Sequence, residues 1–321
     1  MTKSDMMYDP DVFFLLIADD DFNMATSAFQ LQHNTRWFRK ATDGVEEIPI
    51  INSREATPAD QEGLNDEPLR ANNCLVVTFS EIFRTLNDET LKGQDLKDGI
   101  QFGTDPRSSH ILLGCRGTRG VSAKQYIITV DDELCIWLCD YHSKYGTAVG
   151  GDEQNTREAR RQERWILAHS AGTKNIFKTI SISSGKLAIR VEFPNHPRAE
   201  PEYIENLQTF VAASKKAKDS NESQVPAVER LGLDSNLTTG APSECQTPRK
   251  QLIYYKKELI GKGAFGEVHR SLQARTGRYF ASKTFLQPTS KRKRDDTEPV
   301  WVANIRREFT IMIENPHVGV P

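Results

Sequence analysis

The middle of the chain alternates between hydrophobic and polar residues in short stretches that are separated by turn residues. The alternation is clearest over 180–193, where Leu187, Ile189 and Val191 share one face and Arg190 and Glu192 share the other. The pattern predicts strands at 74–79, 111–113, 126–130 and 134–138, followed by a hairpin over 180–193. A series of short alternating strands of this kind predicts an all-β sandwich.

Two further segments flank this predicted sandwich. Apolar residues recur at helical spacing over 201–217, after a proline suited to a first helical turn; they are Tyr203, Ile204, Leu207, Phe210 and Val211. We expect a helix that packs back on the sandwich, and a helix that binds a partner is the alternative. At the other end, residues 1–72 hold a predicted strand that begins near residue 9 and a polar, acidic stretch from residue 52, so we expect an extension that is partly disordered.

Three glycines near the C-terminus interrupt another pattern of short strands. Gly261, Gly263 and Gly266 stand between an apolar pair at 259–260 and Val268, and a turn at 276–278 and an alternating stretch at 279–285 follow. A helical pattern comes next, formed by Trp301, Ile305, Phe309 and Met312, with Glu308 at its edge. A dinucleotide-binding motif would need a helix directly after the glycines and an acidic residue about 20 positions on, and neither is visible.

This order of elements resembles the N-terminal lobe of serine/threonine protein kinases, an α+β lobe with an antiparallel sheet and one helix, over about 252–321. The resemblance implies that the three glycines cover the phosphates of ATP, that Lys283 pairs with these phosphates, and that Glu308 orients Lys283. It also implies that Ile260 and Val268 sandwich the adenine. The residues assigned to ATP in this way are Ile260, Gly261, Lys262, Gly263, Ala264, Phe265, Gly266, Val268, Ala281, Lys283 and Glu308.

Other parts of a complete kinase have no counterpart in this sequence. The catalytic loop, the metal-binding D-F-G motif and the hinge that holds adenine are missing, and a basic segment at 291–294 is inserted between Lys283 and Glu308. Phosphoryl transfer depends on the positions of metal ions and of the attacking hydroxyl. We therefore expect the chain as given to be inactive, with no catalytic residue of its own, and we expect Mg²⁺ only together with a C-terminal lobe. A fragment of a longer kinase and a truncated product both remain open.

Loop motifs within the predicted sandwich resemble those of the forkhead-associated (FHA) domain, a β-sandwich that binds phosphothreonine. The matching order runs through 102–106, 120–125 and 140–147. Thr104, Gln125 and Tyr145 stand where the family has arginine, histidine and asparagine. The resemblance implies a phosphopeptide site made of Ser122, Lys124, Ser143, Lys144, Gly146 and Thr147, with phosphothreonine-containing proteins as partners.

The replacement of the family's arginine by Thr104 is the most serious of these departures. A guanidinium makes two charge-assisted bonds to a phosphate, whereas a threonine hydroxyl makes one neutral bond. Basic residues of nearby loops could compensate; these are Arg107, Arg116, Arg119, Lys124 and Lys144. The alternative is a domain used for packing or dimerisation.

The composition of the chain limits which kinds of partner and which cellular compartments we expect. The 42 basic and 44 acidic residues nearly balance, which argues against a nucleic-acid partner bound through global charge. The five cysteines lack the pairing of a metal site, and we expect a reducing compartment. Cys135 and Cys139, four residues apart on a predicted strand, are expected to be buried thiols. The apolar run at 12–17 is too short to span a membrane. We expect no metal, no membrane and a location in the nucleus or cytoplasm; the basic run at 291–294 is either a nuclear localisation signal or a solvated loop.

The sequence thus predicts four parts: an extension (1–72), an FHA-like sandwich with a C-terminal helix (73–216), a linker (217–250) and a truncated kinase N-lobe (251–321). A sandwich of this type before a kinase domain resembles fungal checkpoint-type kinases, in which the sandwich recruits phosphorylated partners. Our first hypothesis is the N-terminal part of such a kinase. The second is a non-catalytic interaction protein with a vestigial nucleotide lobe.

Overall fold

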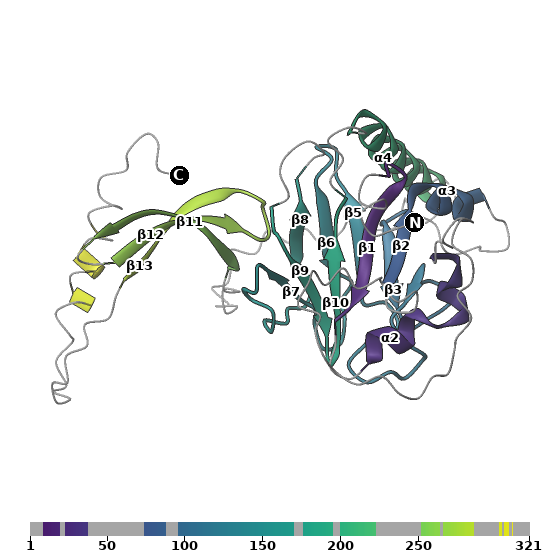
Figure 1. Ribbon diagram of the computed structural model, residues 1–321, viewed down its shortest axis with the longest axis horizontal. Coiled ribbons are helices and arrows are strands. Elements are labelled where there is room, and N and C mark those ends of the chain that lie inside the picture. The colour runs from purple at the N-terminus through teal and green to yellow at the C-terminus, as the bar shows by residue number, and fades with distance from the viewer. Residues whose placement is uncertain are drawn as a thin grey trace, which may run out of the picture. The chain divides into compact units, whose positions relative to one another are not determined.

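The computed structural model describes residues 9–19, 23–37, 74–87, 96–169, 176–194, 200–222, 252–263 and 266–285, with a few residues between 302 and 310 (Figure 1). These residues form three β-sheets. The chain divides into two compact units. The sandwich unit comprises residues 1–255 and 273–278, and the C-terminal unit comprises residues 256–272 and 279–321.

Two five-stranded sheets form the sandwich unit and pack against each other (Figure 1). The first sheet has the order β2 (Cys74–Thr78), β1 (Val12–Ala18), β10 (Leu187–Glu192), β9 (Ile180–Ser184) and β7 (Ala148–Gly151). The second has the order β4 (Ile111–Leu112), β3 (Ile100–Gly103), β5 (Tyr126–Val130), β6 (Ile136–Asp140) and β8 (Arg164–Ala168). The pair β3–β4 is parallel, and the other described pairs are antiparallel.

Helices cover one end of the first sheet. An aromatic cluster joins β1 to α3 (Phe79–Asn87) and α4 (Glu200–Glu222): the Phe13 ring lies 4.8 Å from Phe79 and 5.5 Å from Phe210. The Tyr203 hydroxyl donates to the Phe13 carbonyl at 3.3 Å. The expected packing of the helix against the sandwich is therefore confirmed, and Figure 1 shows α3 and α4 near each other beside β1.

Two short helices follow β1 and support the edge of the second sheet. They are α2 (Met24–Phe29) and a 3₁₀ helix (Gln32–Trp37). The buried Asn34 amide donates to the Leu112 carbonyl at 2.8 Å, and the Leu112 amide donates to the Asn34 side-chain oxygen at 2.9 Å. This side chain pairs with Leu112 of β4 as a neighbouring strand would, so the amide and carbonyl of Leu112 are satisfied at the edge of the sheet.

The prediction of an N-terminal extension over 1–72 is wrong for its first part. Strand β1 lies between β2 and β10, paired antiparallel with both, and its first six residues are buried. A strand buried on both faces reads as a continuous apolar run and lacks the alternation that marks a half-buried strand. The acidic stretch expected at 52–73 lies outside the described residues.

Most strands predicted by alternation are confirmed. The hairpin β9–β10 turns at Gly185, and Leu187, Ile189 and Val191 are buried while Arg190 and Glu192 are half-buried. Strands β2, β4 and β5 match their predictions, and β6 begins two residues later than expected. Strands β3, β7 and β8 were not predicted, because their fully or mostly buried residues lack a clear period. Helix α3 was also missed, although its apolar residues recur at helical spacing. The expected linker starts later than residue 217, since α4 continues to Glu222.

A three-stranded sheet in the order β11 (Tyr254–Gly263), β12 (Gly266–Gln273), β13 (Tyr279–Phe285) follows. The three predicted strands and the turn before the last of them are present. The expected glycine loop is not seen as such: Gly261 and Gly263 lie within β11, Gly266 begins β12, and residues 264–265 lie outside the described residues. Ile305 is helical as expected, but Trp301, Glu308, Phe309 and Met312 lie outside the described residues. No helix within the described part of the chain is long and apolar enough to cross a membrane.

Candidate functional sites

One face of the C-terminal sheet collects residues that the sequence assigned to ATP. Val268 lies directly opposite Lys283, and Arg270 lies opposite Ala281, in the antiparallel pair β12–β13. Side chains of opposed residues share a face, and residues two apart on one strand share it as well. Val268, Ala281 and Lys283 therefore project from the same side of the sheet, which we call the Lys283 face.

The Lys283 face is open to solvent. Ala281 and Lys283 are exposed and Val268 is half-buried. Ile260, which the sequence also assigned to the adenine, is 61% exposed. Val268 and Ala281 share their face with the Lys283 ammonium, so this face offers an adenine apolar contact and a phosphate a positive charge.

The three glycines differ in how much space a side chain would have at their positions. A Cβ at Gly261 or Gly263 would meet no atom within 4 Å among the described residues. A Cβ at Gly266 would lie 2.1 Å from the Thr284 carbonyl oxygen of β13. Gly266 is thus required by strand packing, while the contacts of the sheet give no reason for glycine at the other two positions. No described residue occupies the space around those two glycines, so a ligand that approaches the backbone would meet none of the described atoms there.

Lys262 has a partner within the glycine segment. Its ammonium lies 3.0 Å from the Glu267 carboxylate, on the far side of the turn between β11 and β12. The hydrogen bond from Lys262 holds the pKa of the Glu267 carboxyl below its ordinary value. This exposed pair joins the ends of the two strands at the turn. Ala264 and Phe265, assigned to the same turn, lie outside the described residues, as does Glu308.

A second cation, Arg270, shares the Lys283 face and was missed in the sequence. Its guanidinium lies 4.0 Å from the centre of the Tyr279 ring, and Lys283 lies 4.8 Å from the centre of the Phe285 ring. The signal was available, because Val268 and Arg270 are two residues apart on a predicted strand and must point the same way.

The loops expected to bind a phosphopeptide are held together by Gln125. Its side chain accepts from the Ser122 amide at 2.7 Å and donates to the Gly146 carbonyl at 3.0 Å and the Thr147 hydroxyl at 3.1 Å. The Ser122 hydroxyl accepts from the Lys144 amide at 2.9 Å. Gln125, which stands where the FHA family has histidine, thus links the loop at 120–125 to the loop at 140–147. The Ser122 hydroxyl, which already accepts one hydrogen bond, can donate its proton to a further acceptor.

Asp140 anchors the second of these loops. Its carboxylate accepts from the Ser143 hydroxyl at 2.5 Å and the Thr147 hydroxyl at 2.8 Å, and from the amides of Ser143 and Gln162. Ser143, Gly146 and Thr147 are buried. Their bonds shape the loop from within, so Ser122, Lys124 and Lys144 are the assigned residues that reach solvent. Sequence reasoning missed Asp140, although it begins the 140–147 motif.

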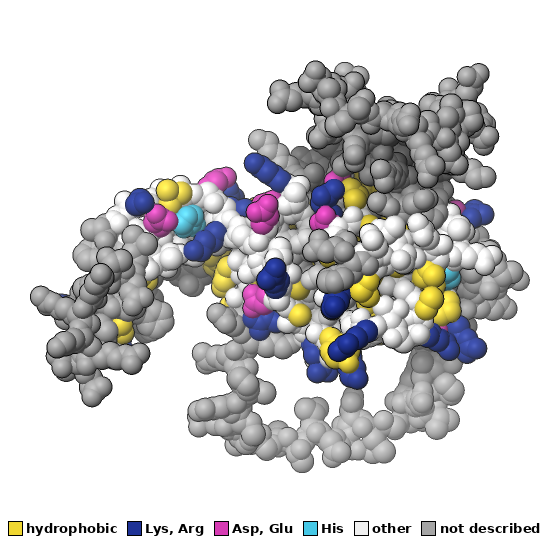
Figure 2. Space-filling view, turned by 60° about the horizontal axis from the view of Figure 1, so that its bottom comes forward, with side chains coloured by type: hydrophobic (Ala, Val, Ile, Leu, Met, Phe, Trp, Pro, Cys, Tyr) yellow, Lys and Arg dark blue, Asp and Glu magenta, His cyan; other side chains and the backbone are white. Residues whose placement is uncertain are grey.

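Basic side chains surround the same loops. Arg107, Arg119, Lys124 and Lys144 are exposed, and Thr104 is 4% exposed. Arg116 is bound to Asp105 at 2.7 Å, and this contact lowers the pKa of the Asp105 carboxyl. Figure 2 shows several basic side chains gathered on one part of the sandwich surface. The positive charges on these loops can therefore attract an anion, although Thr104 is buried and has no guanidinium to bind it.

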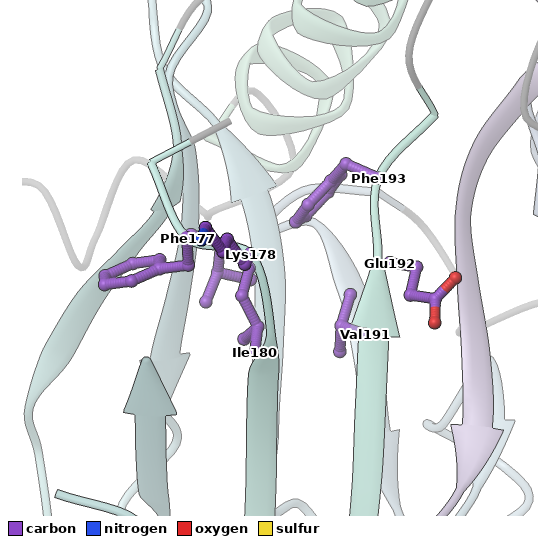
Figure 3. A pocket seen from close by; sticks show the side chains of 7 residues that line it. Phe177, Lys178, Ile180, Val191, Glu192 and Phe193 are labelled. Atoms are coloured by element: carbon purple, nitrogen blue, oxygen red, sulfur yellow. The ribbon is translucent and has the colours of Figure 1, made fainter. Parts of the chain in front are cut away.

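A cavity of about 230 Å³ lies elsewhere in the sandwich unit, among β8, β9 and β10 (Figure 3). Its lining residues are Leu167, Phe177, Lys178, Ile180, Val191, Glu192 and Phe193. Figure 3 shows the Glu192 carboxylate pointing away from Phe177 and Phe193. No residue that the sequence assigned to a site lines this cavity, and its lining combines apolar side chains with Lys178 and Glu192.

Comparison with known proteins gives no family for this chain: no protein-family model matches it, and no curated protein matches it. Its function must therefore be argued from the residues and their geometry. Among the described residues, no group of three or more His, Cys, Asp or Glu side chains could hold a metal ion.

Proposed function

We propose that the chain is the N-terminal part of a serine/threonine protein kinase of the FHA-kinase type, and that its C-terminal sheet binds ATP. The observation that carries the proposal is the register of β12 and β13, which puts Val268, Ala281 and Lys283 on one face. Gly261 and Gly263 support it, because no described atom lies within 4 Å of a Cβ at either position. The residues present thus fit an adenine nucleotide.

In this proposal each group has one task. Val268, Ala281 and Ile260 contact the adenine, and the amides beside Gly261 and Gly263 approach the phosphates. The Lys283 ammonium binds the α- and β-phosphates as a point charge. Phosphoryl transfer to a hydroxyl also needs metal ions and a catalytic loop, which a C-terminal lobe would supply.

Replacing Lys283 by methionine tests the nucleotide site. We expect the affinity for a fluorescent ATP analogue to fall about tenfold or more, because a charge-assisted bond to phosphate is lost. The melting temperature of the sandwich should stay unchanged. Lys186→Met, in the exposed turn between β9 and β10, is the control for loss of one positive charge. Equal affinity in the Lys283→Met variant and the unmodified protein would contradict the assignment.

The loops of the sandwich favour a second activity, recognition of phosphothreonine as in FHA domains. Gln125 and Asp140 order the two loops, and the Ser122 hydroxyl has a proton to donate beside exposed Lys124 and Lys144. A phosphate monoester accepts such bonds and is attracted by the basic rim. In this proposal the sandwich recruits phosphorylated partners to the kinase.

A Ser122→Ala variant tests this second activity. We expect its affinity for a phosphothreonine peptide to fall about fivefold to tenfold, since one hydrogen bond to a charged group is lost. Ser27→Ala, at an exposed serine of α2, should bind as the unmodified protein does. Calorimetry with phosphorylated and unphosphorylated forms of one peptide measures the difference. If Ser122→Ala binds the phosphorylated peptide normally, the site lies elsewhere.

The alternative function is a non-catalytic phosphothreonine-binding or interaction protein with a vestigial nucleotide lobe. The two functions differ in what the Lys283 face does. Peptide binding without any nucleotide binding would favour the alternative, whereas nucleotide binding that depends on Lys283 would favour the kinase.

A further inference from the structure

The sandwich unit includes two short segments from the C-terminal sheet, residues 252–255 and 273–278. The Ile166 amide of β8 donates to the Ala274 carbonyl at 2.9 Å, and the Ala274 amide donates to the Ile253 carbonyl at 3.0 Å. Strand β8 is the last strand of its sheet. The two segments therefore continue the hydrogen bonding of the sandwich beyond its edge strand, which is how peptides are added to sheets.

A buried tyrosine fixes the first segment. Tyr255 is 0% exposed, and its hydroxyl donates to the Val149 carbonyl of β7 at 2.7 Å. Its ring meets the Phe177 ring edge-on, with 4.8 Å between centres. Ile253 is 6% exposed. Burial of an aromatic ring with a satisfied hydroxyl is a specific anchor.

The second segment is a turn that fits closely against the sandwich. The Arg164 guanidinium donates to the Arg275 carbonyl at 2.9 Å and lies 4.1 Å from the centre of the Trp137 ring. Gly277 has a φ of +68°, and a Cβ there would lie 2.6 Å from the Ile166 side chain. A larger residue at this position would be strained in its backbone and would collide with β8.

We propose that Trp137, Val149, Arg164, Ile166 and Phe177 form an intrachain recognition surface, the β8 docking surface, whose occupant is residues 252–255 and 273–278 of the same chain. The occupant covers an edge strand that would otherwise present unpaired amides beside apolar side chains. A tether within one chain raises the local concentration of the occupant. A sandwich that ended at residue 250 would therefore lack this occupant, and folding of the sandwich depends on residues up to 278. The proposal rests on these contacts and is independent of the proposed function.

Hydrogen exchange in the full chain tests the proposal. The Ile166 amide should be protected, although it lies in an edge strand. An Ala274→Glu variant puts a charge at a position that is 1% exposed, so we expect exchange at Ile166 to become about tenfold faster or more. The Ile128 amide in β5 reports whether the sandwich is folded. Ala212→Glu makes the same substitution at an exposed position of α4, away from the β8 docking surface, and should leave Ile166 protected.

A second variant covers the case in which Ala274→Glu does not fold. Tyr255→Phe keeps the ring and removes only the bond to Val149, and exchange at Ile166 should still become faster. Unchanged exchange in Tyr255→Phe and in a folded Ala274→Glu would overturn the proposal. Light scattering over a range of concentrations identifies the occupant. A dimer that dissociates in either variant would mean that the occupant comes from a second copy, contrary to the proposal.

Discussion

Replacing Asp140 by alanine is expected to lower the free energy of unfolding of the sandwich by about 3–5 kcal/mol. The carboxylate is 6% exposed and accepts from two hydroxyls and two backbone amides. Removing it takes the acceptor from three buried donors, which belong to Ser143 and Thr147, and from the part-buried Gln162 amide. Each donor that water cannot reach costs about 1–3 kcal/mol when it is left unsatisfied. The loop at 140–147 should therefore lose its order before the rest of the sandwich.

Urea unfolding followed by tryptophan fluorescence measures the change. Asp132→Ala is the matched control, because Asp132 forms an exposed ion pair with Lys215 at 2.7 Å. Pairs of this kind contribute about 1 kcal/mol or less. If Asp140→Ala lost no more stability than Asp132→Ala, the Asp140 network would not be what holds the loops in place.

A Gly266→Ala variant is expected to destabilise the β11–β12–β13 sheet by about 2 kcal/mol or more. The added Cβ would overlap the Thr284 carbonyl oxygen at 2.1 Å, and backbone cannot move aside as a flexible side chain can. Strands β12 and β13 must then separate near Phe285. Nucleotide binding should be lost with the sheet, because Val268 and Lys283 depend on this pairing.

A Gly263→Ala variant provides the comparison. Its Cβ meets no described atom within 4 Å, so amide exchange across β12 and β13 should stay as in the unmodified protein. If phosphates approach this backbone, the methyl group should still lower the affinity for an ATP analogue by about tenfold. Normal affinity in this variant would remove the glycine segment from the nucleotide site. Loss of protection in both variants would show that both glycines are structural.

Local patterns in the sequence predicted the strands and helices that have one buried face and one exposed face. Alternation predicted β5, β13 and the β9–β10 hairpin, and helical spacing predicted α4. The shared face of Val268, Ala281 and Lys283 also follows from strand periodicity once β12 and β13 pair. Much of the candidate nucleotide site could thus be predicted, since its residues lie within a short stretch of chain.

Only the tertiary structure decided the features that join distant segments. It put β1 between β2 and β10, where a strand buried on both faces carries no alternation to reveal its partners. It also brought Gln125 to Gly146 and Thr147, and Ala274 to Ile166. These contacts depend on which strands become neighbours, and neighbours are selected by the packing of the whole core. Periodicity records only whether a residue faces inward, so it cannot identify the residue that it meets there.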